Sequence, residues 1–363
     1  MRKAAQAALT RAPTLGEWQD AEWLRKNGFP SWLDALKAIH SPRAIDDLSP
    51  GSRAVQRLAF DELLANQLAL ALIRKARRKA AGRSYPAKGD LVSRGRKALP
   101  FQLTGAQTQA LKEILADLEA PHRMVRLVQG DVGSGKTVVA FLAALRVIEN
   151  CAQAALLAPT EILARQHVET LGPLAQRCGV SLEILTGRDK GAARDRKRAQ
   201  VANGRTQILV GTHALIQEDV VFADLGLVVI DEQHRFGVNQ RAALAAKGAR
   251  TDLLVMTATP IPRTLALTAY GDMDVSAIRE KPPGRKPVDT RALPVDRMED
   301  VIGAIGRLIA KGDQAYWVCP LVEESKAVPV TAAEERFHHL HGLFGERVGL
   351  VHGRMSPAEK DAV

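Results

Sequence analysis

Apolar residues recur along the chain with two different periods. In residues 52–81 they are spaced as on one face of a helix, which predicts a single helix of about eight turns. From Phe101 onward, short apolar runs alternate with helical stretches, a pattern typical of a parallel β-sheet flanked by helices. The predicted strands are residues 126–129, 154–158, 182–185, 208–210, 227–230 and 253–256.

Glycine and proline mark the expected boundaries. Residues 14–40 predict short helices that carry Trp18, Trp23 and Trp32 into a core, with Ser31 as an N-cap. Residues 82–100 are typical of a linker, and the segment 281–287 predicts a second connector. Beyond it, residues 288–292, 316–318 and 348–351 predict the strands of another sheet. We therefore expect a helical arm with a basic linker (1–98), a complete α/β domain (99–284) and the start of a second (285–363).

Composition and charge exclude several classes. With 46% hydrophobic and 25% charged residues in 363, the chain is neither disordered nor collagen-like. Its net charge of +11 comes from residues 1–100, which hold 19 Lys and Arg against 9 Asp and Glu, whereas the other 263 hold 32 against 31. The basic cluster at 74–79, continued to Lys97, fits a polyanion or a solvated helix face with a flexible linker, and charge alone does not separate the two.

Other functional classes have weak signals. Cys151, Cys178 and Cys319 lack the spacing of a disulfide framework or a zinc site, and no apolar run approaches about 18 residues. The cysteine pattern favours a location inside a cell, and the lack of a long apolar run predicts no segment that spans a membrane. His338 and His341 share a helical face, but without a nearby carboxylate or cysteine at ligand spacing an exposed polar face is the better interpretation. The charge-rich helix at 190–198 is interpreted as solvated surface.

The strongest chemical signal is a phosphate-binding loop. A strand ends at Gln129, a helix starts at Val138, and the residues between them fit the pattern G-x-x-x-x-G-K-[ST]. Glycines allow backbone N–H groups to approach a triphosphate, the lysine would reach its β- and γ-phosphates, and the threonine would hold Mg²⁺. We therefore expect ATP and Mg²⁺ at Gly130, Asp131, Val132, Gly133, Ser134, Gly135, Lys136 and Thr137.

Two further strands would bring chemistry to the same edge. The strand at 227–230 leads into Asp231 and Glu232, where Asp231 would orient Mg²⁺ and Glu232 would act as general base on water. The strand ending at Met256 leads into Thr257 and Thr259 and should lie beside the Asp231 strand. These hydroxyls would relay the state of the phosphates, or they would form an ordinary capped turn.

Together these features indicate a superfamily 2 helicase, and the surrounding residues are similar to the RecG family of bacterial branched-DNA helicases. The transcription-repair coupling translocases share the stretch at 257–264 but typically carry Asp-Glu-Glu-Gln at 231–234, so RecG is the better match. The resemblance covers nearly the whole chain and rests on residues 99–107, 129–137, 158–164, 211–217, 231–237, 256–264, 283–287, 319–325 and 351–355.

The resemblance implies a RecA-like fold and specific roles. Phe101 and Gln107 would flank and read adenine, and Gln233 and His234 would couple hydrolysis to movement. DNA backbone contacts would come from turns after strands and at helix starts, where hydroxyl and N–H groups commonly meet phosphates. The residues implied for these contacts are Pro159, Thr160, Gly211, Thr212 and His213.

The resemblance also implies an ATP-dependent DNA helicase or translocase that acts as a monomer on branched DNA, in recombination and repair in the bacterial cytoplasm. In this family a wedge domain precedes the region matched by residue 1, and the arginine finger follows the last matched segment. Because an arginine finger contributes on the order of a thousandfold to phosphoryl transfer, we expect this chain to bind ATP and Mg²⁺ but to hydrolyse and unwind poorly alone. A non-catalytic nucleotide- and DNA-binding module and an RNA-directed ATPase are the alternatives.

Overall fold

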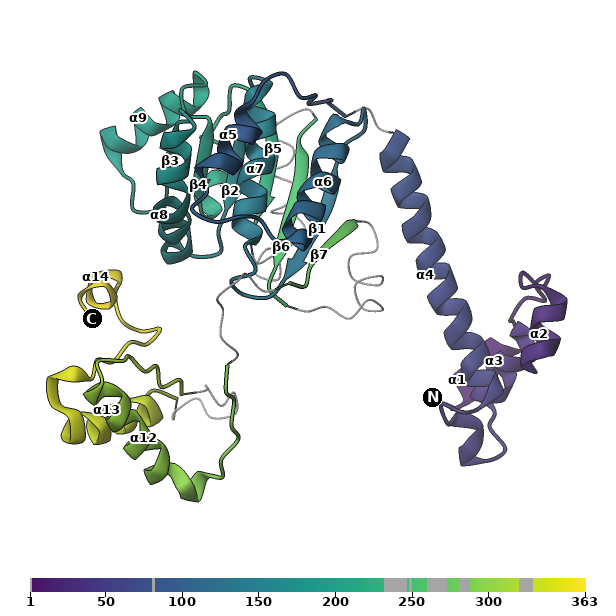
Figure 1. The fold of residues 1–363 in the computed structure, drawn as a ribbon. Coiled ribbons are helices and arrows are strands. Elements are labelled where there is room, and N and C mark those ends of the chain that lie inside the picture. The colour runs from purple at the N-terminus through teal and green to yellow at the C-terminus, as the bar shows by residue number, and fades with distance from the viewer. Residues whose placement is uncertain are drawn as a thin grey trace. The chain divides into compact units, whose positions relative to one another are not determined.

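A seven-stranded parallel sheet organises the first part of the chain (Figure 1). The computed structural model describes residues 2–79, 82–231, 247, 250–259, 273–280, 288–319 and 329–363. The strand order is β3-β4-β2-β5-β6-β1-β7. The strands are β1 (Val125–Gly130), β2 (Gln153–Leu157), β3 (Leu182–Leu185), β4 (Ile208–Gly211), β5 (Leu225–Ile230), β6 (Asp252–Thr257) and β7 (Asp274–Ile278).

Six of these strands confirm the sequence prediction, and β7 was missed. Its residues, Asp-Val-Ser-Ala-Ile, contain no continuous apolar run, because the strand lies at the sheet edge with only β1 as its neighbour. An edge strand has less surface to bury, so its apolar signal is weaker than that of the central strands.

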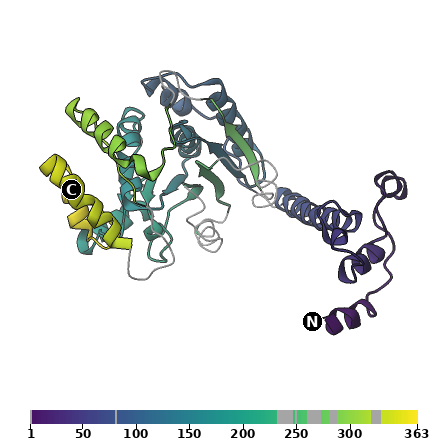
Figure 2. The ribbon, with the colours of Figure 1, turned by 90° about the horizontal axis from the view of Figure 1, so that it is seen from below.

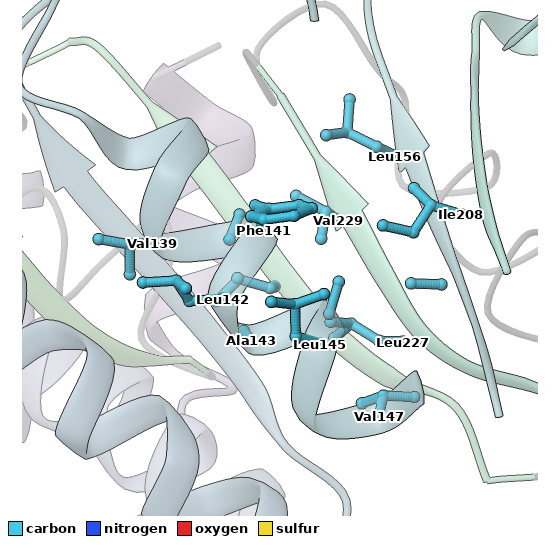
Figure 3. Packing of buried hydrophobic residues seen from close by; sticks show 14 of the residues in the cluster. Val139, Phe141, Leu142, Ala143, Leu145, Val147, Leu156, Ile208, Leu227 and Val229 are labelled. Atoms are coloured by element: carbon cyan, nitrogen blue, oxygen red, sulfur yellow. The ribbon is translucent and has the colours of Figure 1, made fainter. Parts of the chain in front are cut away.

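Three helices supply most of the helical side of the main core, which they form with one face of the sheet. They are α6 (Gly105–Glu119), α7 (Lys136–Glu149) and α8 (Glu161–Arg177). Between Val138 and Ile148 every residue of the central helix α7 is buried, and all of them except Arg146 are apolar, as expected of a helix buried on all sides. In Figure 3 its Phe141 lies among side chains of the strands, including Val229.

The opposite face holds a second cluster, because successive strand residues point to opposite sides of a sheet. On β5, Leu227 and Val229 belong to the first cluster, whereas Val228 and Ile230 belong to the second. Helix α9 (Gly191–Ala202) adds Val201 to this second cluster. The resulting double-sided burial explains why the central strands are continuous apolar runs.

The sequence suggested a linker at residues 82–100, but residues 82–98 are packed against the sheet domain. They contain helix α5 (Leu91–Ala98), which packs against α7, and the side chain of Tyr85 is fully buried. Gly95 faces α7 so closely that a Cβ there would lie 2.3 Å from Leu145 Cδ1. The glycine that looked like a loop signal therefore permits close helix packing.

The N-terminal helices are α1 (Arg2–Leu9), α2 (Ala21–Asn27), α3 (Trp32–His40) and α4 (Arg53–Lys79), with a 3₁₀ turn at Ile45–Leu48. Figures 1 and 2 show α4 as one continuous helix, as predicted. The Ser31 cap is confirmed, since its side chain accepts from the Asp34 N–H at 3.2 Å. The core assignment is wrong for Trp18, which is 47% exposed, because its indole instead covers the buried guanidinium of Arg57, 5.5 Å from the ring centre.

Residues 286–363 form a separate compact unit. Its main helices are α12 (Met298–Ala310), α13 (Pro329–Phe344) and α14 (Pro357–Ala362), with 3₁₀ turns at Val295–Arg297 and Gly345–Arg347. The strands predicted at 288–292, 316–318 and 348–351 are absent, since none of these described segments pairs with a neighbour. Tyr316 is 91% exposed. Alternating apolar residues show what a segment can pair with, but a strand forms only when a partner satisfies its backbone.

The connector predicted at 281–287 lies outside the described residues. Within the parts of the chain that the structure describes, no helix has the length and apolar character needed to span a lipid bilayer.

A buried carboxyl at the start of β6 makes stability depend on pH. Burial raises the pKa of Asp252 to about 7, against a smaller opposing effect of the Met124 N–H, which donates to Oδ1 at 2.7 Å. Unfolded, this carboxyl would titrate near its ordinary value of 3.8. Between about pH 4 and 7 the folded state therefore binds more protons, and stability falls as pH rises through this window, by at most about 4 kcal/mol.

We expect urea unfolding to show a smaller free energy at pH 8 than at pH 5, and the difference to shrink in Asp252→Asn. Asparagine keeps the acceptor for Met124 and removes the titration. Equal pH dependence in the two proteins would contradict this assignment.

Candidate nucleotide and DNA sites

The carboxyl ends of the parallel strands meet at one edge of the sheet, where ligands bind in open α/β folds. The order of the strands in the sheet gives the order of the predicted site residues along this edge. The phosphate loop follows β1, the Thr257 turn ends β6, and Asp231 follows β5. The segments implied for DNA follow β2 and β4, on the other side of β5. Asp231 therefore lies between the two groups.

Loop residues 130–135 have the backbone that a phosphate cradle needs. Gly133 and Gly135 have φ of +75° and +84°, in the left-handed region that favours glycine. A Cβ on Gly130 would lie 2.5 Å from Ser134 Oγ, which is buried and has no hydrogen-bond partner among the described residues. Val132 is at the exposed tip of the loop, where the Asp131 carboxylate accepts from its N–H at 2.9 Å.

Lys136 begins α7 and turns its side chain back into the loop. Its Nζ donates to Gly130 O at 2.7 Å and to Asp131 O at 3.0 Å. These carbonyls hold a buried ammonium inside the loop, where a phosphate would be a stronger, charged acceptor. Thr137 is the next residue on the same helix turn.

Gln107 supports the loop from α6. Its Nε2 donates to Ser134 O at 2.8 Å, while its Oε1 accepts from the Thr104 N–H at 2.9 Å in a capping box. The side chain is buried, whereas Phe101, its predicted companion on adenine, is 49% exposed. The family resemblance implied a base-reading role for Gln107, and the structure adds its hydrogen bond to the loop at Ser134.

The turn after β6 is tied to the phosphate loop. The Thr257 hydroxyl accepts from the Thr259 N–H at 3.2 Å, and Gln129, directly before the loop, donates to Thr259 O at 3.3 Å. The pairing of β5 with β6 confirms that this turn lies beside the Asp231 strand.

Asp231 contacts a residue that the sequence did not single out. Its Oδ2 lies 2.8 Å from Nε2 of His167 on α8, and both side chains are largely buried. A lone histidine in an apolar helical stripe gives no functional signal by itself, and only the tertiary fold joins these two residues. Glu232, Gln233 and His234, the other predicted catalytic residues, lie outside the described residues.

The segments implied for DNA begin helices. Thr160 caps α8 by accepting from the Leu163 N–H at 3.3 Å, and it follows Pro159. Gly211 ends β4, Thr212 is buried, and the exposed His213 starts a 3₁₀ turn, His213–Leu215. At this edge of the sheet one segment therefore begins α8 and the other begins a 3₁₀ turn.

The donor set fits a nucleotide with magnesium. Positive-φ glycines, a buried ammonium and a serine hydroxyl with no partner in the described chain suit a polyphosphate. One carboxylate and one hydroxyl are enough protein ligands for Mg²⁺, which usually takes its other ligands from water and from the phosphates of the substrate. Among the described residues no group of three or more His, Cys, Asp or Glu side chains could form an all-protein metal cage.

Comparisons with known proteins agree with this geometry. The DEAD/DEAH box helicase model matches residues 104–268. The ATP-dependent DNA helicase RecG of Escherichia coli (strain K12) is 47% identical over 346 residues, which cover 93% of this chain and 50% of the relative. The RecG of Bacillus subtilis (strain 168) is 43% identical over 367 residues, covering 100% of this chain and 53% of the relative.

Among solved structures, a RecG bound to a three-way DNA junction superposes with a TM-score of 0.75 at 40% identity, covering 96% of this chain and 45% of that one. The helicase MrfA, at 20% identity and a TM-score of 0.51, shares the fold. The chain spans about half the length of the curated relatives it matches. With a RecA-like sheet and this level of identity along nearly its whole length, the chain belongs to the RecG family.

Proposed function

We propose that this chain supplies the ATP-binding lobe and helical arm of an ATP-dependent DNA helicase of RecG type that acts on branched DNA in recombination and repair. The observation that carries the proposal is the order of the sheet edge. Lys136 follows β1 and Asp231 follows β5, two strands away, and the segments implied for DNA contact follow β2 and β4 on the other side of β5. We further propose that it works as a monomer in the bacterial cytoplasm.

In this proposal Lys136 binds the β- and γ-phosphates, and Thr137 and Asp231 hold Mg²⁺. The metal ion would neutralise charge that develops on the phosphates during transfer to water. Glu232 would take the proton of the attacking water, with Gln233 and His234 coupling the reaction to movement. Phe101 and Gln107 would contact the adenine base. The turn at Thr257 and Thr259 would sense the phosphates through Gln129, which joins it to the loop.

DNA would bind through phosphate contacts without reading sequence. The backbone of one DNA strand would contact the protein at the sheet edge, at Pro159, Thr160, Gly211, Thr212 and His213. A second contribution would come from the basic face of α5, where Arg94, Arg96 and Lys97 are exposed while Leu91 and Gly95 face the core. The three-way junction in the related RecG structure is consistent with a branched substrate.

The test measures ATP binding, ATP hydrolysis and DNA binding by the 363-residue chain, with fork DNA and with RNA. We expect Mg²⁺-dependent ATP binding, low turnover and a preference for forked DNA. Appreciable fork-stimulated turnover would mean that this chain alone completes the catalytic site, and a preference for RNA would favour an RNA-directed ATPase. Lack of ATP binding would contradict the proposal.

Salt dependence tests the α5 surface separately. Each DNA phosphate that the protein no longer neutralises should reduce the slope of log affinity against log salt by about 0.9. We expect the combined variant Arg94→Gln, Arg96→Gln and Lys97→Gln to reduce this slope. The control variant, Lys190→Gln with Arg196→Gln, changes exposed basic residues at α9 and should leave the slope unchanged. An unchanged slope in the α5 variant would exclude α5 from the DNA site.

A further inference from the structure

The contact between His167 and Asp231 joins two elements that are distant in sequence, 64 residues apart. The Nε2 to Oδ2 distance of 2.8 Å is that of a charge-assisted hydrogen bond, and the side chains are only 10% and 13% exposed. An ionised carboxylate only accepts hydrogen bonds. With the Asp231 carboxylate ionised, His167 donates through the hydrogen on Nε2.

The position of His167 is set by packing. Along α8, Ala164, His167, Leu171 and Leu174 recur at helical spacing and are all buried. The apolar neighbours belong to the main core, so the imidazole stands on a helix face that cannot rotate independently of the sheet. A rigid donor of this kind restricts the orientation of the carboxylate it holds.

We propose that His167 is a positioning residue that orients Asp231 for Mg²⁺. It binds Oδ2, whereas Oδ1 makes no hydrogen bond to any of the residues placed by the structure. The carboxylate thus keeps one oxygen for a ligand while the other is fixed by protein. Partners that orient metal ligands in this way are commonly worth 10- to 100-fold in metal affinity. This inference depends on the proposed role of Asp231 in binding MgATP.

A purely structural histidine would behave differently. If His167 only fills the apolar face of α8, leucine should replace it without effect on metal binding. If it orients Asp231, leucine should weaken the response to Mg²⁺ while leaving the metal-free site intact. Glutamine can present an amide N–H at a similar reach, so it should restore part of the function.

The experiment titrates a fluorescent ATP analogue into the full chain in EDTA and at increasing Mg²⁺, and follows Mn²⁺ binding by electron paramagnetic resonance. For His167→Leu we expect an unchanged affinity in EDTA, an unchanged melting temperature, and about tenfold more Mg²⁺ or Mn²⁺ for half-saturation. For His167→Gln we expect a metal requirement closer to that of the wild type.

Three results would overturn the proposal. They are a wild-type metal requirement in His167→Leu, an equal loss in the leucine and glutamine variants, or a parallel loss of affinity in EDTA, which would indicate a folding role. If the wild-type chain binds the analogue without responding to metal, the proposed role of Asp231 and this inference fail together. If wild-type binding depends on metal, the results for the His167 variants test the role of His167 alone.

Discussion

Replacing Lys136 by alanine is expected to abolish measurable ATP turnover and to weaken ATP binding by tenfold or more. A buried ammonium that bonds the triphosphate contributes about 1.5–3 kcal/mol as a charged hydrogen-bond partner. Removing such a group from a phosphoryl-transfer site costs further stabilisation as charge develops, on the order of 10²- to 10³-fold in rate. The measurements are the binding of a fluorescent ATP analogue and steady-state phosphate release with fork DNA.

Lys136→Arg is the matched control because it keeps the charge but changes the shape of the donor. The lysine ammonium is a compact point charge that here donates to the Gly130 and Asp131 carbonyls, whereas the guanidinium of arginine is planar, larger and presents its donors in a fixed fork. We expect arginine to retain part of the binding and little of the turnover. Wild-type affinity in Lys136→Ala would show that the loop does not bind the triphosphate through this residue.

The second large effect concerns stability. Phe141 is almost completely buried and packs against strand side chains, as Figure 3 shows for Val229. Phe141→Ala would leave a cavity at the centre of the main core, and such truncations cost about 3–5 kcal/mol. The measurement is urea unfolding. The transition to analyse is the one that moves to higher urea concentration when ATP is added, because it reports on the unit that contains Phe141 and not on residues 286–363.

Phe141→Leu serves as the comparison because it retains most of the apolar volume. We expect it to lose less than half as much stability as the alanine variant. A loss below about 1 kcal/mol in Phe141→Ala would mean that the site collapses around the missing ring or that α7 is packed less tightly than the structure indicates.

The central sheet was predictable because its strands are buried on both faces. Runs such as Leu227 to Ile230 leave little choice of element, and the order of motifs along the chain then assigns the phosphate loop and Asp231 to strand ends. The Ser31 cap was likewise predictable, because a hydroxyl before an apolar helical stripe is a strong cap signal.

What the sequence could not show depends on partners distant in the chain. β7 became a strand because β1 offered it an edge, and residues 316–318 did not because no described neighbour pairs with them. The brace from Gln107 to Ser134 and the contact of His167 with Asp231 are tertiary, so no spacing rule finds them. Gly95 was taken as part of a linker because, in a sequence, a glycine that allows a neighbouring helix to pack closely cannot be told from a glycine that interrupts a helix.

The packing of α5 on α7 also bears on how such a chain can be recombined in evolution. A domain boundary placed at Phe101, where the alternating strands and helices begin in the sequence, would exclude Tyr85 and α5. One side of α7, the helix that carries Lys136, would then lose the contacts that bury it. The unit that can be inherited intact therefore reaches back to about residue 82. Any gene fusion that exchanges the preceding helices must therefore retain this short segment.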